Sequence, residues 1–526
     1  MARHIFLLNL HHGWKLWKIK AFWVVWVEWT NWFYMMKKLN IRYRSWLLWS
    51  GIIVGILVVS VGYSLTTEDS ITFIDDENTG NKALDESLST EKLELRYSNE
   101  YRSWQNTADT SFSSLFNGNR SVDLLAERPN LVILWAGYAF SKSYCTPRGH
   151  MYAINDLDVS LRTGAPRGED DGPQPAACWA CKSSDASRLI DKIGREAFYK
   201  RKWAAWGSDI VNPVACADCH EPESMELHIP RLFLIEACSR KGMNIDNISE
   251  QEMRSLVCAQ CHCEYYFSKD EKQVILPWDN GYSAEDIEKY YDRSGFSDFV
   301  HKLSRAPLLK VQHPDYELAQ MGIHARRGVS CGECHMPYVG ENNEGYNDHH
   351  VQSPLAMIDR TCQTCHRETE ETLRQDVYDR QIKVAEIRDR LETELTKAHI
   401  EAKFAWDRGA TEKQMKSVLK LIRQAQWRWD FGTTSHGAAF HAPQEVLRIL
   451  GDGIDKAMQA RINIAQVLFK LGYSGDVSMP DISTKEKAQK YIGLDMDTEN
   501  INKEKFLKTV LPRWREEAKA NELLIR

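Results

Sequence analysis

The C-terminal third of the chain has the clearest periodic pattern of hydrophobic and polar positions. Its apolar side chains recur at helical intervals of three, four and seven residues, beginning with Leu373, Val377, Val384, Ile387, Leu391 and Leu395. Such spacing places the side chains on one face of an amphipathic helix. We expect this helix to end near Gly409, because glycine readily adopts the backbone conformation found just beyond helix C-termini.

Three further helical segments are predicted downstream. Thr411 and Gln414 form a capping-box sequence, which begins a helix whose apolar face contains Met415, Val418, Leu419 and Ile422. Pro443 suits the first position of another helix, and residues 504–524 predict more helix, broken or kinked at Pro512. Residues 371–526 therefore form a predicted helical region. Its apolar faces fit core packing or a subunit interface, and periodicity leaves both open.

Upstream, residues 178–366 contain many glycines, prolines and short irregular stretches, so few long helices are expected there. This segment holds five cysteine pairs at uneven spacing, with no accompanying sequence repeat. The first is Cys178-Trp-Ala-Cys181-Lys182. The other four end in histidine: Cys216-Ala-Asp-Cys219-His220, Cys258-Ala-Gln-Cys261-His262, Cys331-Gly-Glu-Cys334-His335 and Cys362-Gln-Thr-Cys365-His366.

The Cys-x-x-Cys-His pattern is the attachment motif of c-type haem. Its two thiols form thioethers to the haem vinyl groups, and the next residue binds the iron. Chance would give about 0.01 such matches in a chain of this composition. Cys-x-x-Cys is also half of a zinc site, but zinc does not require a histidine directly after each second cysteine. We therefore predict five covalently bound haem c groups, with Lys182 replacing histidine at one.

These patterns predict a mainly α multihaem cytochrome c. Haems would fill an irregular core in residues 96–370, the pentahaem catalytic region, and long helices would follow in residues 371–526. The chain has 526 residues, 43% of them hydrophobic and 27% charged, which is a soluble globular balance. Its net charge of −6 argues against a nucleic-acid partner. Cys145, Cys238 and Cys263 stand outside the motifs, and we interpret them as buried free thiols or local packing.

Covalent haem attachment normally occurs outside the cytoplasm, so an export signal is expected. Residues 46–65 are uncharged and mostly apolar, long enough to span a bilayer. Basic residues precede this run at Lys37, Lys38, Arg42 and Arg44, which favours a cytoplasmic N-terminus. Residues 1–65 are thus an export signal or an N-terminal membrane anchor, and the protein is expected in the periplasm, either secreted or anchored.

Two short segments complete the predicted organisation. Residues 1–35 fit a start-site artefact, because Met36 followed by two lysines begins a cleaner export signal. Residues 66–95 are polar and acidic without a sustained apolar period, so we expect a tether.

From about Asn130 to the end of the third C-terminal helix, the chain resembles cytochrome c nitrite reductase, the ammonia-forming pentahaem family. The resemblance rests on the order of the motifs, the lysine in the first motif, and three segments outside the motifs: Leu161–Pro166, Cys263–Phe267 and Lys310–Pro314. It implies that Lys182 is the proximal ligand of the catalytic haem, whose opposite face stays open. It also implies a distal pocket of Arg162, Tyr265 and His313.

The resemblance further implies one Ca²⁺ ion and four distal histidines. Calcium would be bound by side-chain oxygens of Glu264 and Gln312 and by backbone carbonyls of Tyr265 and Lys310, a hard-oxygen set that suits this ion. The implied distal pairings are His150 with His262, His324 with His366, His349 with His220, and His441 with His335. His349 is preferred to its neighbour His350. Two imidazoles saturate the iron and leave it suited to electron transfer.

The implied activity is the six-electron reduction of nitrite to ammonium. Electrons would come from a quinol-oxidising membrane cytochrome, and the C-terminal helices would form a homodimer. Two other functions stay open. An electron-transfer cytochrome without its own substrate would need every iron six-coordinate, and Lys182 lacks a surplus distal partner. A hydroxylamine-converting oxidoreductase is disfavoured because such relatives have more haem motifs. A zinc-binding structural protein is a more distant alternative.

Overall fold

The computed structural model describes residues 96–523 apart from 117, 222 and 341–344. All of these residues belong to one compact unit, Gly80–Arg526. The predicted export signal or anchor and the whole of the predicted tether lie outside the described residues. Within the described part, none of the helices combines the length and the apolar character that crossing a membrane requires.

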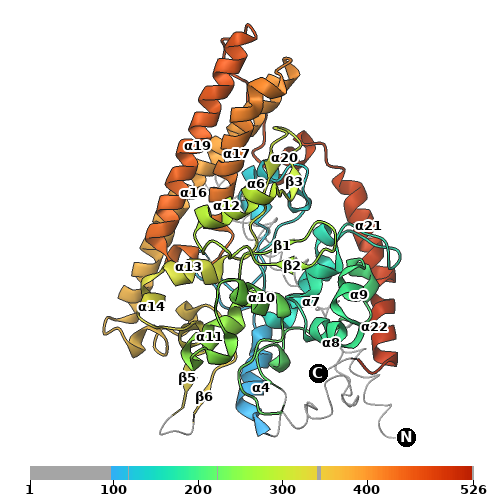
Figure 1. Cartoon of the computed structure of the whole chain (residues 1–526), viewed down its shortest axis with the longest axis vertical. Helices are drawn as coiled ribbons and strands as arrows, with labels where there is room; N and C mark the ends of the chain where they lie inside the picture. Colours follow the sequence, from blue (N-terminus) through green and yellow to red (C-terminus); the bar gives the residue numbers. More distant parts are fainter. Residues whose placement is uncertain (1–95, 117, 222, 341–344, 524–526) are drawn as a thin grey trace, which may run out of the picture. The chain divides into compact units, whose positions relative to one another are not determined.

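Helices dominate the described chain, as predicted (Figure 1). The α-helices of the first part are α4 (Ser98–Gln105), α5 (Leu124–Glu127), α6 (Asn130–Leu134), α7 (Ala153–Val159), α8 (Ser184–Ile193), α9 (Arg195–Tyr199), α10 (Leu232–Arg240), α11 (Glu250–Ala259), α12 (Ala284–Ser294), α13 (Asp315–Met321), α14 (Ile323–Arg326) and α15 (Cys331–His335). Those of the second part are α16 (Glu370–Asp407), α17 (Glu412–Thr433), α18 (Ala438–His441), α19 (Pro443–Lys470), α20 (Lys485–Tyr491), α21 (Met496–Thr509) and α22 (Leu511–Ala520).

The strands of the described residues have two residues each and pair into three antiparallel hairpins. They are β1 (Tyr266–Phe267) with β2 (Val274–Ile275), β3 (Phe299–Val300) with β4 (Pro307–Leu308), and β5 (Tyr338–Val339) with β6 (Tyr346–Asn347). The 3₁₀ helices are η2 (Asn106–Ala108), η3 (Ala139–Ser141), η4 (His150–Tyr152), η5 (Leu161–Thr163), η6 (Ala176–Trp179), η7 (Trp203–Trp206), η8 (Cys216–Asp218), η9 (Ile245–Asn247), η10 (Pro354–Ala356) and η11 (Cys362–Thr364).

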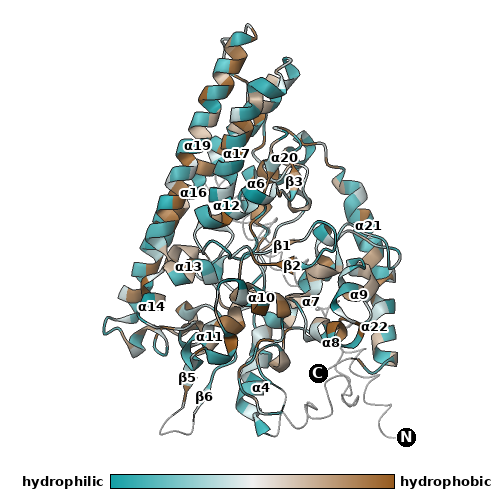
Figure 2. Ribbon diagram, viewed as in Figure 1, coloured by the Kyte–Doolittle hydropathy of each residue, from teal (hydrophilic) through white to brown (hydrophobic). Residues whose placement is uncertain are grey.

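The long C-terminal helices form where the periodic pattern predicts them. Helix α16 ends at Asp407, and Gly409 follows with a positive φ of 88°, a conformation that glycine adopts without steric cost. The Thr411 and Gln414 side chains make the predicted capping box at the start of α17. Pro443 opens α19. Figure 2 shows hydrophilic and hydrophobic residues alternating along these helices, whose apolar faces join one core with α6.

The C-terminal segment is helical, as predicted, but its first helix begins before residue 504. Helix α21 starts at Met496 and ends at Thr509, and Pro512 stands in the first turn of α22, so the helix is broken beside Pro512 as predicted. Both helices pack into a second core around the first cysteine motif. The Trp203 ring stacks on Trp179 at 5.0 Å and meets Trp514 of α22 edge-on at 5.5 Å.

The segment that carries the motifs is irregular, as predicted. In the described part of residues 96–370 the longest α-helix is α12, with 11 residues. One expectation is wrong: Cys145 is exposed, whereas Cys238 and Cys263 are buried. Cys145 lies in a short backbone bridge to Asp123, which keeps it out of both main cores.

Candidate haem sites and catalytic centre

Each cysteine motif is one turn of helix. In three of them the backbone N–H of the histidine donates to the carbonyl of the first cysteine, at 2.8 Å for His220, 2.9 Å for His262 and 2.9 Å for His366. The fourth histidine, His335, ends the short helix α15. Side chains three positions apart share a helix face, so both thiols of a motif point to the same side, as attachment to one haem requires.

The motifs adjoin one another in a definite order. The Cys181 thiol of the first motif donates to the carbonyl of Gln260 in the third motif at 3.7 Å. Helix α11, which leads into the third motif, contacts the fourth motif, because the backbone N–H of Cys331 donates to the Ser255 hydroxyl at 3.1 Å. The fourth motif lies near the fifth, because Cys362 acts electrostatically on Cys334. The third motif therefore joins the lysine motif to the rest of the chain of motifs.

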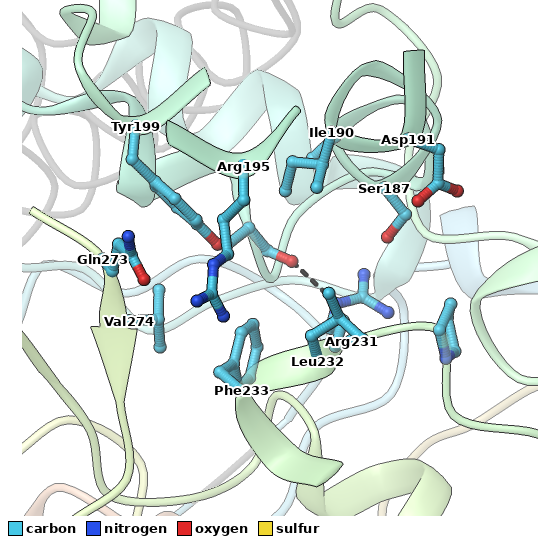
Figure 3. Close-up of a pocket in the computed structure, with 13 residues that line it drawn as sticks. Ser187, Ile190, Asp191, Arg195, Tyr199, Arg231, Leu232, Phe233, Gln273 and Val274 are labelled. Atoms are coloured by element: carbon cyan, nitrogen blue, oxygen red, sulfur yellow. Dashed lines mark hydrogen bonds between the residues drawn. The ribbon is translucent and has the colours of Figure 1, made fainter. Parts of the chain in front are cut away.

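A buried arginine that sequence reasoning missed ties three motifs together. Arg231 and Asp218 form an ion pair of 2.5 Å, each 2% exposed. Arg231 also donates to the carbonyl of Ala180 at 2.7 Å and to the side chain of Gln260 at 3.0 Å. Figure 3 shows Arg231 in the pocket beside the first motif, with Tyr199 of α9 among its other lining residues. Because these partners belong to the first, second and third motifs, Arg231 fixes their relative positions.

The structure brings together all four histidine pairs implied by the resemblance. The ring centroids lie 6.2 to 6.5 Å apart: His150 and His262 at 6.5 Å, His220 and His349 at 6.2 Å, His324 and His366 at 6.4 Å, and His335 and His441 at 6.3 Å.

This spacing fits one iron between two imidazoles. Two metal–nitrogen bonds of about 2 Å each, extended to the ring centroids, span about 6.3 Å. Burial lowers the pKa of most of these rings, to about 4 for His150 and for His335. They consequently stay neutral, which is the form that binds a metal. The residues present therefore fit four bis-histidine haems.

The partners of the ring nitrogens differ among these histidines. Backbone carbonyls contact Nδ1 of His220 at 2.7 Å, His349 at 2.7 Å and His335 at 2.8 Å. At His262 the partner is instead the Asp315 carboxylate, 3.5 Å away. Burial lowers the pKa of His262, but the hydrogen bond and charge of Asp315 outweigh this and raise it above its ordinary value.

The four predicted catalytic residues come from separate loops around the first motif. Lys182 follows η6, and its backbone N–H donates to Trp179 at 2.9 Å. Arg162 lies in η5, with its guanidinium 4.4 Å from the ring of Phe140. Its carbonyl accepts from Gln174 at 2.9 Å, and Gln174 in turn contacts Cys178 at 3.4 Å. The Arg162 loop is thus tied directly to the first motif.

The electrostatics of these loops suits an anion and its protonation. Burial lowers the pKa of His313 well below its usual range, and the nearby Lys182 charge lowers it further. Burial raises the pKa of Tyr265 well above its usual value, with the neighbouring Cys181 and Cys178 adding to the effect. At neutral pH the pocket thus combines the cation Arg162 with a neutral imidazole and a protonated phenol.

A buried lysine from α21, also missed from the sequence, braces the Arg162 loop. The Lys503 ammonium donates to the hydroxyl of Thr163 at 3.1 Å and to the carbonyl of Gly164 at 2.8 Å. The residue is 4% exposed. Since Thr163 and Gly164 directly follow Arg162, the C-terminal helix helps to fix the position of the predicted anion-binding residue.

The predicted calcium residues lie close together. The fully buried Glu264 carboxylate accepts from the Tyr291 hydroxyl at 2.9 Å and from the backbone N–H of Gln312 at 2.7 Å. The Gln312 amide nitrogen is 3.3 Å from the carbonyl of Lys310. Exchanging the oxygen and nitrogen positions of the Gln312 side-chain amide would place its oxygen beside the carbonyl oxygen of Lys310, an arrangement that a bound cation stabilises. The donor set therefore fits Ca²⁺.

Helix α17 anchors this same loop through a buried ion pair. The Lys310 ammonium lies 2.9 Å from both oxygens of Asp430, and each side chain is 1% exposed. Asp430 also accepts from the backbone N–H of Val311 at 2.8 Å. A sequence signal for this role exists, because Asp430 interrupts the aromatic run between Trp427 and Phe431.

An irregular half bearing five attachment turns and four histidine pairs, beside a long-helix bundle, defines a multihaem c-type cytochrome. Residues 89–522 match the cytochrome c552 family. The chain is 60% identical to cytochrome c-552 of Parabacteroides distasonis over 93% of this chain and 99% of that protein. It is 44% identical to cytochrome c-552 of Haemophilus influenzae over 83% and 84%. The chain belongs to the cytochrome c552 family.

A solved structure is also similar. It is a cytochrome c nitrite reductase from Desulfovibrio desulfuricans, described with two calcium sites in its catalytic subunit. The TM-score is 0.68 at 27% sequence identity, and the match covers 78% of this chain and 89% of that one.

Proposed function

We propose that this chain is a periplasmic cytochrome c nitrite reductase that forms ammonium. The observation that carries the proposal is the contrast among the five motifs. Eight histidines pair across the four Cys-x-x-Cys-His motifs, whereas the motif with Lys182 lies beside residues suited to an anion. The activity of the similar solved enzyme supports the same conclusion.

The reaction combines nitrite with six electrons and eight protons to give ammonium and two waters. When bound at Lys182, the haem supplies an open iron coordination position and the electrons. Arg162 binds the anion through its fixed positive charge. His313 donates a hydrogen bond to a nitrite oxygen and relays protons, because its ring is neutral at neutral pH. Tyr265 keeps its phenolic proton and supplies a second donor.

Calcium belongs to this proposal as a structural ion. Glu264 and Gln312 would bind it by side-chain oxygens, and Tyr265 and Lys310 by carbonyls. Burial raises the pKa of Glu264 well above its usual value. A cation beside this carboxylate would act against that effect and favour the ionised form. Because His313 directly follows Gln312 and Tyr265 directly follows Glu264, the ion would hold both proton-delivering residues in place.

We further propose a homodimer formed through α19. Met458, Ile462, Ala465 and Phe469 alternate at spacings of four and three along this helix; we call them the α19 stripe. The three larger members are 48%, 51% and 72% exposed. Apolar residues at this spacing form the seam of paired helices, and a second copy offers the same seam in a two-fold symmetric contact.

The remaining proposals concern the supply of electrons, the N-terminal segment and the division of the chain into regions. A quinol-oxidising membrane cytochrome would supply electrons to a bis-histidine haem, and closely spaced haems would carry them to the Lys182 site. Residues 46–65 would act as an uncleaved anchor or as an export signal, with 66–95 as the tether. The division into a pentahaem region at residues 96–370 and a helical region at 371–526 is also part of the proposal, and the start of the long helix α16 at Glu370 supports it.

The test is dye-driven nitrite reduction by the haem-replete protein. Arg162→Gln, Tyr265→Phe and His313→Asn should each lower the turnover of nitrite by roughly a hundredfold or more, the usual effect of removing a positioned proton donor or charge. Arg167→Gln is the matched control, because Arg167 is exposed five residues beyond Arg162. Full activity in all three variants, or none in the unmodified protein, would contradict the proposal and favour an electron carrier.

A further inference from the structure

Asp315 occupies a special place beside the haem ligands. It begins α13 two residues after His313, and its carboxylate lies 3.5 Å from Nδ1 of His262. The second carboxylate oxygen accepts a hydrogen bond from the Ser435 hydroxyl. A backbone hydrogen bond also joins the segments of Asp315 and His262, since the N–H of Tyr316 donates to the carbonyl of His262 at 3.0 Å.

None of the other ligand rings contacts a comparable buried carboxylate at Nδ1. The charge of Asp315 also acts on His441 and His335, but among the ligand rings it contacts His262 directly. His220, His335 and His349 have neutral backbone carbonyls at Nδ1. His366 has a carboxylate, Glu368, at 3.9 Å, but the two side chains are 49% and 54% exposed. Solvent screens such an exposed pair. The His262 side chain is 54% exposed, but the Asp315 side chain is only 21% exposed, so solvent screens the Asp315 carboxylate less than the Glu368 carboxylate.

The position of His262 gives this contact its importance. Its motif contacts the first motif, since the Cys181 thiol donates to the carbonyl of Gln260 at 3.7 Å. Helix α11, which leads into the same motif, contacts the fourth motif, since the backbone N–H of Cys331 donates to the Ser255 hydroxyl at 3.1 Å. A haem held between His150 and His262 would therefore be the junction through which electrons reach a haem at Lys182.

We propose that Asp315 is a positioning residue that orients His262 and lowers the reduction potential of this junction haem below those of the other three bis-histidine haems. A carboxylate hydrogen-bonded to a ligand imidazole increases the basicity of the ligand and stabilises the oxidised metal. A junction of low potential passes each electron onward instead of retaining it. The inference rests on the proposed ligand pairing and not on nitrite as the substrate.

The experiment is a spectroscopic redox titration of the holoprotein at fixed pH. Three variants are compared with the unmodified chain: Asp315→Asn removes the charge, Asp315→Glu keeps it, and Glu368→Gln removes the exposed carboxylate beside His366. Low-spin EPR signals identify the haems, because they depend on the angle between the two ligand rings. That angle is 52° for His150 and His262, against 37° for one other pair and 73° for two.

The inference predicts an upward shift of one midpoint potential in Asp315→Asn, carried by the haem with the 52° signal. Asp315→Glu should return that potential most of the way to the unmodified value, and Glu368→Gln should leave all potentials unchanged. A correctly folded Asp315→Asn protein with four unshifted low-spin haems would overturn the inference alone, as would a shift in the haem of His335 and His441 as large as that of the 52° haem. Fewer than four bis-histidine haems in the unmodified protein would overturn the ligand pairing as well.

Discussion

Replacing Phe469 by glutamate should weaken the proposed homodimer. Phe469 ends the α19 stripe and is 72% exposed in the single chain. Complete burial of a phenylalanine side chain contributes about 1.5–3 kcal/mol, so covering the exposed part contributes roughly 1–2 kcal/mol. A two-fold contact uses the residue twice. The substitution should therefore cost about 2–4 kcal/mol, which raises the dimer dissociation constant roughly 30- to 700-fold.

Sedimentation velocity across a concentration series measures this constant directly. Ile501→Glu is the matched control, because Ile501 is 65% exposed on α21 and lies outside the α19 stripe. It adds the same charge at an exposed apolar position and should leave association unchanged. The reasoning is refuted if Phe469→Glu associates as tightly as the unmodified chain, or if both substitutions dissociate it equally.

Three further predictions test the buried charged and titratable residues. Lys310→Met leaves Asp430 buried and unpaired, so it should destabilise the protein by about 3–5 kcal/mol, and adding Asp430→Leu should recover much of that loss in chemical unfolding. Burial lowers the pKa of His399 to about 4 from an ordinary 6.5; the unfolded chain binds the extra proton first, so stability should fall by roughly 3 kcal/mol as pH drops from 6.5 to 4. His399→Gln should flatten that acid limb of the stability curve. Lys503→Met should raise the KM for nitrite about tenfold by loosening the Arg162 loop, and a KM equal to that of the unmodified enzyme would count against this role.

Local patterns predicted the long helices well. The apolar period of α16 and the capping box of α17 depend on residues close in sequence, so both could be predicted without knowing the fold. The covalent haem motifs are local in the same way. The docking of α22 is not: the contact between Trp514 and Trp203 joins residues more than three hundred positions apart, and no periodicity encodes it.

The candidate site divides along the same line. The proximal ligands can be predicted from the motifs alone. The four distal histidines could be predicted only from the resemblance to the family, because a single histidine belongs to no recognisable motif. Arg231, Lys503 and Asp315 were missed for a related reason. An isolated charged residue is usually exposed, and only the tertiary structure shows that these three are largely buried and which partners they contact.

The central claim is that this one chain catalyses the complete six-electron reduction of nitrite to ammonium. The most direct measurement supplies ¹⁵N-nitrite to the dye-reduced, calcium-loaded holoprotein and counts both the ¹⁵N-ammonium formed and the dye oxidised. The account predicts one ammonium and six electrons per nitrite, with no nitric oxide or hydroxylamine accumulating. Nitrite consumption that stops at either of those species, or no consumption at all, would contradict it.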